Sequence, residues 1–160
     1  MQNKYKLPDD VRRTVIGIVI GYNRRKDIIK ERESEICAIS GGRFETYTSI
    51  SGEEVREFTP SGKGGTSSPV ERQADDLAYY HETDFDYKCN KAIDEALDSL
   101  PLGHFSADAA NGIRKNIIKS CVKGHNYNFN YSGIYVIGRS RFYQLRNLFL
   151  YYIAIKLKFI

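Results

Sequence analysis

The chain has 160 residues, of which 41% are hydrophobic, including 12 Tyr and 8 Phe. This composition excludes a disordered polymer and is enough for one domain or two small helical ones. Residues 101–160 carry nine Lys or Arg and one acid, Asp108, for a charge of +8, whereas residues 1–100 carry 15 basic and 19 acidic residues, for −4. A strongly basic C-terminal third joined to a mildly acidic remainder is typical of a nucleic-acid-binding module.

The candidate metal-binding and redox residues are few and widely separated in the sequence. They are Cys37, Cys89, Cys121, His81, His104 and His125. This spacing argues against a disulfide framework and against a metal site. No nucleophile–base pair or carboxylate pair can be assembled either, and the apolar run 14–21 is too short to cross a bilayer. We therefore expect a soluble cytoplasmic protein with no cofactor, no catalytic activity and no membrane partner.

The N-terminal region, residues 1–40, is predicted to be one long helix from about 9 to 36, interrupted at most near Gly17 and Gly21. The alternating charges of residues 30–33 indicate a solvent-exposed face. Residues 41–67 are dense in Gly, Ser and Pro, which predicts a flexible loop or linker with one weak strand over 43–50. The segment 62–67 lacks the residue order of a phosphate-binding loop and has no strand before it.

A central helical pair is predicted over residues 68–102. Ser68, Pro69 and Glu71 form a capping-box pattern that begins a helix running to about Tyr80. The apolar positions of this helix are Val70, Ala74, Leu77 and Ala78. A second helix begins near Asp84 and ends before Pro101, and its predicted buried face consists of Phe85, Cys89, Ile93, Ala96, Leu97 and Leu100.

Residues 103–160 have the pattern of a helix-turn-helix domain. The predicted elements are a helix over 106–123 that Ser106 begins and Gly124 closes, a short helix near 128–135, a turn at 136–138, and a long helix from about 139. We expect Gly138 to adopt a conformation that a Cβ would resist. The apolar face of the last helix consists of Phe142, Leu145, Phe149, Tyr152 and Ile153. Its second half must pack against the N-terminal region or against a second copy of the chain, which leaves a homo-oligomer open.

The polar residues of this domain are the candidate contacts to double-stranded DNA. The candidate phosphate contacts are Arg139, Arg141 and Arg146, and those to base edges in the major groove are Ser140, Tyr143, Gln144 and Asn147. Lys115, Lys119 and Lys123 follow one another at intervals of four, which places them on one helix face beside the adjacent DNA backbone.

Several of these segments also carry a family resemblance. They are residues 67–74, 91–97, 119–124, 139–146 and 149–157. Together they resemble the phage late-transcription regulators of the RinA/ArpU type, whose C-terminal domain is similar to region 4 of bacterial sigma factors. Gly138 stands where the family pattern tends to show Ser, so the usual side-chain cap is missing. The resemblance implies a phage or prophage regulator that binds a promoter and recruits host RNA polymerase to transcribe packaging and structural genes.

The sequence thus predicts an all-α protein with an N-terminal helical region and a C-terminal, sigma-region-4-like helix-turn-helix. The expected function is sequence-specific DNA binding and transcription activation at the nucleoid. The alternative is a structural DNA-packaging adaptor of the terminase small subunit type, which also couples a helix-turn-helix to an oligomerising helical region. A closed ring of many copies with weak sequence preference would favour that alternative.

Overall fold

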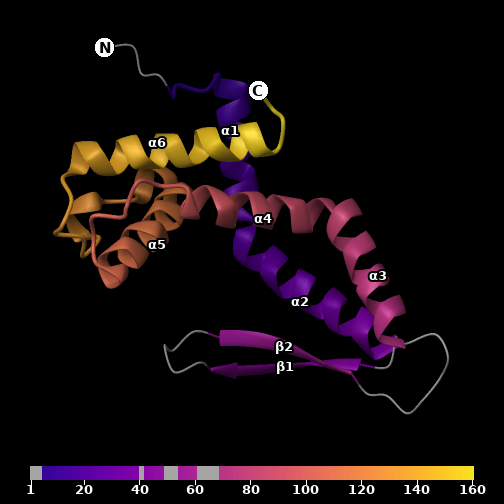
Figure 1. The fold of residues 1–160 in the computed structure, drawn as a ribbon. Coiled ribbons are helices and arrows are strands. Elements are labelled where there is room, and N and C mark those ends of the chain that lie inside the picture. The colour runs from indigo at the N-terminus through magenta and orange to yellow at the C-terminus, as the bar shows by residue number, and fades with distance from the viewer. Residues whose placement is uncertain (1–4, 40–41, 49–53, 61–68) are drawn as a thin grey trace. The chain divides into compact units, whose positions relative to one another are not determined.

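The computed structural model describes residues 5–39, 42–48, 54–60 and 69–160. The chain is mostly helical, as the sequence predicts (Figure 1). The helices are α1 (Asp9–Ile20), α2 (Tyr22–Ile39), α3 (Pro69–Thr83), α4 (Phe85–Asp98), α5 (Ala107–Lys123) and α6 (Arg139–Lys156). Two strands, β1 (Gly42–Thr48) and β2 (Glu54–Pro60), and two 3₁₀ turns, η1 (Gly124–Asn126) and η2 (Phe129–Tyr131), complete the described elements.

The chain divides into two compact units. Unit 1 comprises Met1–Asn23 with Cys89–Ile160, and unit 2 comprises Arg24–Lys88. The segment 103–160, which the sequence predicts as a separate domain, therefore shares a unit with α1 and with most of α4.

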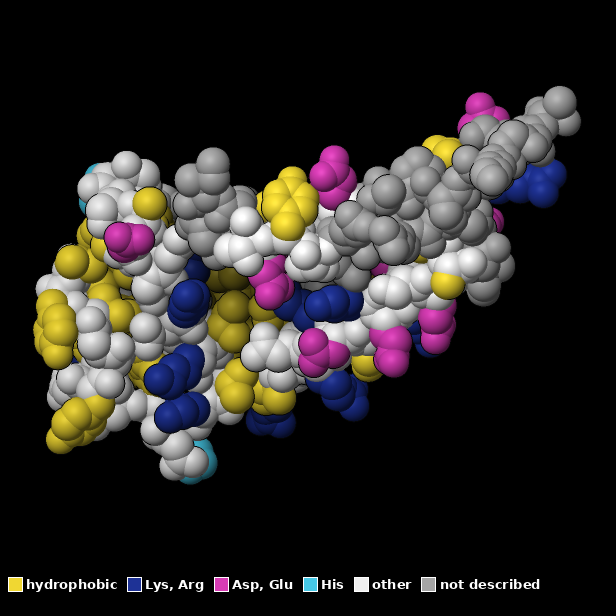
Figure 2. Space-filling model, turned by 90° about the horizontal axis from the view of Figure 1, so that it is seen from below, with side chains coloured by type: hydrophobic (Ala, Val, Ile, Leu, Met, Phe, Trp, Pro, Cys, Tyr) yellow, Lys and Arg dark blue, Asp and Glu magenta, His cyan; other side chains and the backbone are white. Residues whose placement is uncertain are grey.

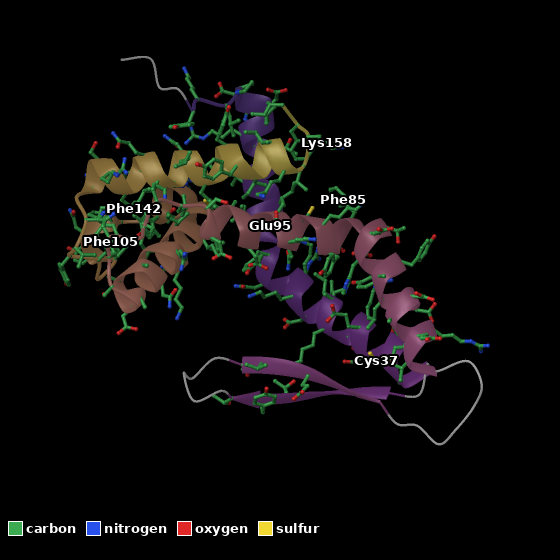
Figure 3. The ribbon with its side chains drawn as sticks, in the orientation of Figure 1. Cys37, Phe85, Glu95, Phe105, Phe142 and Lys158 are labelled. Atoms are coloured by element: carbon green, nitrogen blue, oxygen red, sulfur yellow. The ribbon has the colours of Figure 1, made fainter. Side chains whose placement is uncertain are left out.

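The core of unit 1 surrounds α6. Phe142, Phe149 and Ile153 have no exposed surface, and Leu145 has 1%, which confirms these four residues of the predicted apolar face. Tyr152, the fifth, is half-buried. Phe142 lies between the rings of Tyr127 and Phe129, with centroid separations of 5.7 and 5.1 Å. Figure 3 shows it between α6 and α5. Ile113 and Ile117 of α5 are also fully buried in this core.

Helix α1 supplies a second covering for α6. Val15 and Val19 of α1 are fully buried in the same core as Leu148, Leu150 and Ala154 of α6. The predicted long N-terminal helix is interrupted at Gly21, whose amide bonds back to the Gly17 carbonyl. After this break α2 continues to Ile39. The second half of α6 therefore packs against the N-terminal region of its own chain.

Helix α4 is held by polar contacts as well as by its apolar face. The Asn90 side-chain amide, which is buried, donates to the Tyr22 carbonyl at 3.1 Å, and the Tyr22 hydroxyl donates to Asp94. Cys89 and Ile93 are fully buried as predicted, but Phe85 is 62% exposed. The prediction for Phe85 is wrong because the first α4 residue in the apolar core of unit 1 is Ile93, two turns later along the helix.

Helix α5 begins and ends where the sequence predicts. The Ser106 hydroxyl accepts a hydrogen bond from the Ala109 amide at 3.3 Å, and the Gly124 amide closes the last turn. Gly124 has φ +53° and ψ −124°. This is a positive φ as expected, but the conformation differs from the left-handed helical cap that the sequence predicts.

Unit 2 contains a β-hairpin where the sequence predicts a loop with one weak strand. β1 and β2 pair antiparallel, with Phe44 opposite Phe58 and Tyr47 opposite Val55. The linker prediction is wrong over these two strands, because the backbone of residues 54–60 pairs with that of residues 42–48. The remaining positions of the predicted linker lie outside the described residues.

Helix α3 begins at Pro69 as predicted, and the Ser68 cap lies outside the described residues. Its buried side differs from the prediction, because Gln73 and Tyr80 are buried while Val70, Ala74 and Ala78 are exposed.

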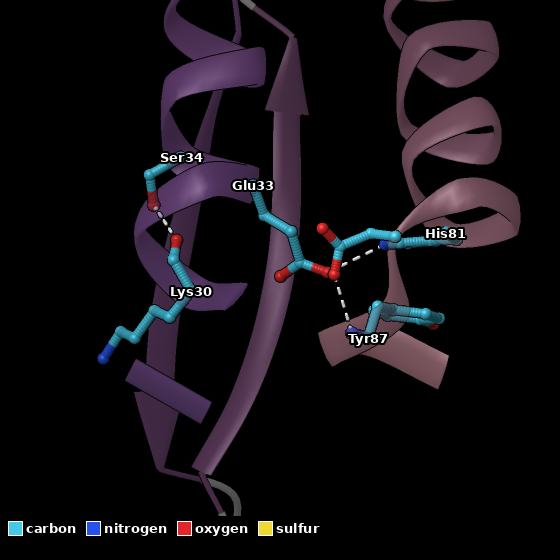
Figure 4. Close-up of polar contacts among 6 residues, drawn as sticks. Lys30, Glu33, Ser34, His81 and Tyr87 are labelled. Atoms are coloured by element: carbon cyan, nitrogen blue, oxygen red, sulfur yellow. Dashed lines mark hydrogen bonds and ion pairs between the residues drawn. The ribbon is translucent and has the colours of Figure 1, made fainter. Parts of the chain in front are cut away.

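The junction between α3 and α4 is fixed by one contact to α2 and by contacts within the junction itself (Figure 4). His81 Nε2 lies 2.9 Å from Glu33 Oε1, and the His81 ring stacks on Tyr87 at 3.9 Å. The Asp84 carboxylate accepts a hydrogen bond from the Tyr87 amide at 2.8 Å and so caps α4.

Truncation of Phe142 to alanine should cost about 3–5 kcal/mol of folding free energy, because it removes a fully buried aromatic ring. Chemical denaturation of full-length Phe142→Ala checks this value. Tyr135→Ala is the matched control, since Tyr135 is 89% exposed and its truncation should change stability by less than about 0.5 kcal/mol. Equal stability of the two variants would contradict the assigned packing of α6.

The contact between α6 and α4 should make stability depend on pH. Lys156 Nζ donates to Glu95 Oε2 at 2.6 Å, and this hydrogen bond lowers the pKa of Glu95. The pair therefore stabilises the fold above the unfolded carboxyl pKa of about 4.3, and loses that effect as the pH falls through the lower folded value.

Because both groups are partly exposed, Lys156→Gln should cost less than about 1 kcal/mol at neutral pH. The difference in unfolding free energy between this variant and the parent protein should decrease as the pH falls from about 5 to about 3. Urea titrations at several pH values measure this difference. Lys158→Gln, which removes an exposed charge two residues further along the chain, should show no such trend.

Candidate nucleic-acid interface

The first turns of α6 present an exposed basic surface. Arg139, Ser140 and Arg141 are all exposed, and no acidic residue lies in this turn. The first amides of a helix have no acceptor within it, and they add to the positive end of the helix dipole. The start of α6 therefore attracts anions through both its backbone and its side chains.

Gly138 is the residue before α6, and its backbone is ordinary. It has φ −73° and ψ 151°, an extended conformation that any residue adopts. The prediction that this position needs glycine is wrong. A Cβ at Gly138 would meet no atom within 4 Å, and the helix start has no side-chain cap.

The predicted base-reading residues differ in their exposure. Ser140 and Gln144 are exposed, and Arg141 Nη1 donates to Gln144 Oε1 at 3.3 Å. Tyr143 is half-buried, with its ring 5.4 Å from that of Phe142 and the Arg139 guanidinium 5.9 Å from its centroid. Asn147 is also half-buried and lines a small pocket. Ser140 and Gln144 are thus the most accessible polar side chains for reading bases.

Arg146 is oriented differently from the other two arginines. Its Nε is buried without a hydrogen-bond partner in the described chain. Burial raises the pKa of the Cys121 thiol, and the Arg146 charge and hydrogen bond oppose that rise. The Arg146 side chain therefore lies beside Cys121 in the protein rather than with Arg139 and Arg141.

Helix α5 presents a second basic surface. Lys115, Lys119 and Lys123 are exposed and lie on one side of the helix, as predicted from their spacing. α5 forms the lower side of unit 1 in Figure 1, and the view from below in Figure 2 shows a row of Lys and Arg side chains there. Arg114 does not join them, because it donates to the Leu97 carbonyl and lies 3.7 Å from Asp98.

The segment between α5 and α6 is not the predicted helix over 128–135. It forms the two 3₁₀ turns η1 and η2, because polar side chains bond locally to the backbone. Asn128 Oδ1 accepts from the Asn130 amide, and Ser132 Oγ accepts from the Ile134 amide. Gly133 then takes φ +76°, which favours glycine and prevents a continuous helix. The middle helix of a helix-turn-helix is therefore absent from this described segment.

The same segment displays two aromatic residues that sequence reasoning missed. Tyr131 and Tyr135 are 87% and 89% exposed, whereas Tyr127, Ile134 and Ile137 anchor the segment to the core. A tyrosine offers both a flat apolar ring and a hydroxyl, a combination that is enriched at binding surfaces. For Tyr131, the alternation of asparagine and aromatic residues over 126–131 was the available signal in the sequence, and no comparable pattern surrounds Tyr135.

Comparison with known protein families, curated proteins and solved structures gives no match. Over the described ranges no helix is long and apolar enough to cross a membrane. Within those same ranges no group of His, Cys, Asp and Glu could hold a metal ion.

A side-chain cap at position 138 should stabilise α6. Gly138→Ser should exceed Gly138→Ala in stability by about 0.5–2 kcal/mol, because only the serine hydroxyl can accept from a free amide of the first turn. Both variants lose the same backbone freedom of glycine in the unfolded chain, so their comparison isolates the cap. Thermal and urea unfolding measure the difference, and equal stabilities would place the start of α6 elsewhere.

Proposed function

We propose that the protein binds double-stranded DNA sequence-specifically through α6 and acts as a transcription activator. The observation that carries the proposal is the exposed strip of Arg139, Ser140, Arg141 and Gln144 at the start of a helix whose opposite side is core. An α-helix fits the major groove of B-DNA, and its N-terminal residues are commonly the ones that contact base edges.

The exposures of these side chains suggest distinct roles. Arg139 and Arg141 would contact phosphates beside the free amides of the first turn, and Ser140 and Gln144 would read bases. Lys115, Lys119 and Lys123 would bind the adjacent backbone, since all three are exposed at one-turn intervals. Tyr143 and Arg146 would support α6 from beneath, because each is partly buried against a neighbouring side chain.

The biological setting of the proposal comes from the sequence resemblance. A RinA/ArpU-type regulator would act during phage or prophage growth, with host RNA polymerase as its partner and late packaging and structural genes as its targets. The 3₁₀ turns before α6 depart from the helix-turn-helix of that family. The proposal of DNA binding therefore draws its support from the surfaces of α5 and α6 rather than from the motif as a whole.

Binding free energies of variants on specific and on random DNA should distinguish residues that contact bases from residues that contact phosphates. Selection from a random duplex library would provide the preferred site. On that site, Gln144→Ala should cost on the order of 1–3 kcal/mol of binding free energy, and much less on random DNA. Arg141→Ala should weaken both duplexes about equally and reduce the log–log salt slope by about 0.9, as expected for one lost phosphate contact.

Lys158→Gln is the control for charge, because Lys158 is an exposed cation beyond the opposite end of α6 (Figure 3). It should leave the affinity for both duplexes within about twofold of the parent protein. Equal losses on specific and random DNA for Gln144→Ala would remove Gln144 as a base reader. Absence of any salt-dependent duplex binding by the parent protein would contradict the proposed function.

A further inference from the structure

A small pocket lies where the N-terminal segment meets α6. It has a volume of about 130 Å³ and is lined by Tyr5, Lys6, Leu7, Arg12, Asn147 and Leu150. The segment is held against the helix by two contacts. The Tyr5 ring meets the Tyr151 ring edge-on at 5.4 Å, and Leu7 is buried in the core of unit 1. Of the residues that line the pocket, Leu7 and Leu150 belong to the buried core.

The polar lining of the pocket is cationic and lacks a counter-charge. Lys6 and Arg12 are exposed, and neither forms an ion pair with a described residue. The Asn147 amide adds neutral hydrogen-bonding groups, and no carboxylate lines the pocket. Leu7 and Leu150 form an apolar wall, which lowers the local dielectric and strengthens the attraction of the cations for an anion.

We propose that this pocket binds a phosphate group through Lys6, Arg12 and Asn147. Arginine and lysine are the side chains that most often bind phosphate, and an amide can donate to a third oxygen. Such a phosphate group could belong to the DNA backbone or to a free phosphate ion.

The position of the pocket on α6 favours the DNA backbone, a choice that rests on the proposed function. Asn147 follows Gln144 by three residues and Ser140 by seven, which places it about 4.5 and 10.5 Å further along the helix axis. A backbone phosphate in the pocket would thus lie at the end of the base-reading strip. In this arrangement the N-terminal segment holds the strand beside the groove that α6 enters.

Two measurements on the full-length protein test the pocket. The first follows the Asn147 side-chain amide by NMR during titration with inorganic phosphate, against chloride at equal ionic strength. The second measures duplex affinity against salt for Arg12→Gln and Lys6→Gln. Arg13→Gln is the matched control, because Arg13 is the exposed neighbour of Arg12 and does not line the pocket. The melting temperature of each variant verifies that it folds.

The expected result is a phosphate-dependent shift of the Asn147 amide that Arg12→Gln abolishes and Arg13→Gln retains. If DNA supplies the phosphate, Arg12→Gln and Lys6→Gln should each make the salt slope shallower by about 0.9, and Arg13→Gln should not. A shift of the amide with unchanged DNA slopes would support a free phosphate as the ligand.

No shift of the Asn147 amide, together with identical DNA slopes for Arg12→Gln and Arg13→Gln, would overturn the proposal. If the parent protein binds no DNA, the proposed function fails, and the phosphate titration alone then decides whether the pocket is an anion site.

Discussion

Phe142 lies between the rings of Tyr127 and Phe129, and this aromatic cluster fixes both the rotation of α6 and the course of the segment before it. Residues of a helix are separated by 100°, so burying Phe142 on one side determines which residues face outward. Ser140, Arg141 and Gln144 are exposed for this reason. The exposure of the candidate interface is therefore a consequence of core packing. It does not depend on contacts among the interface residues.

The burial of α6 changes along its length. Near Arg139 one side packs and the rest is open, whereas further along, Leu148, Leu150 and Ala154 are also buried because α1 covers a second side. The N-terminal residues thereby become neighbours of Asn147. A surface formed by residues from both ends of the chain can contact more of a DNA backbone than one helix alone.

The positive charge of the C-terminal third is partly used within the fold. Arg146 lies beside Cys121, Arg114 beside Asp98, and Lys156 beside Glu95. The other six of the nine basic residues are exposed: Lys115, Lys119, Lys123, Arg139, Arg141 and Lys158. The positive charge that residues 101–160 can offer to a partner is thus smaller than the nine Lys and Arg residues in their sequence suggest. It is concentrated on α5 and at the start of α6, with one cation beyond the end of α6.

The sequence by itself determined α3, α4, α5 and α6 and the buried side of α6, because apolar periodicity and the Ser106 cap are local properties of the chain. Local patterns could not predict the 3₁₀ turns at 124–131, where Asn and Ser side chains compete with helical hydrogen bonds. Local patterns also could not predict that Arg146 lies beside Cys121 or that Phe85 is exposed. Both depend on which distant segments of the chain pack against these residues. Only the tertiary structure decided that α1 covers α6 and places Lys6 and Arg12 beside Asn147. These residues come from parts of the chain more than a hundred positions apart. They meet because packing α1 against α5 and α6 removes the apolar faces of the three helices from water.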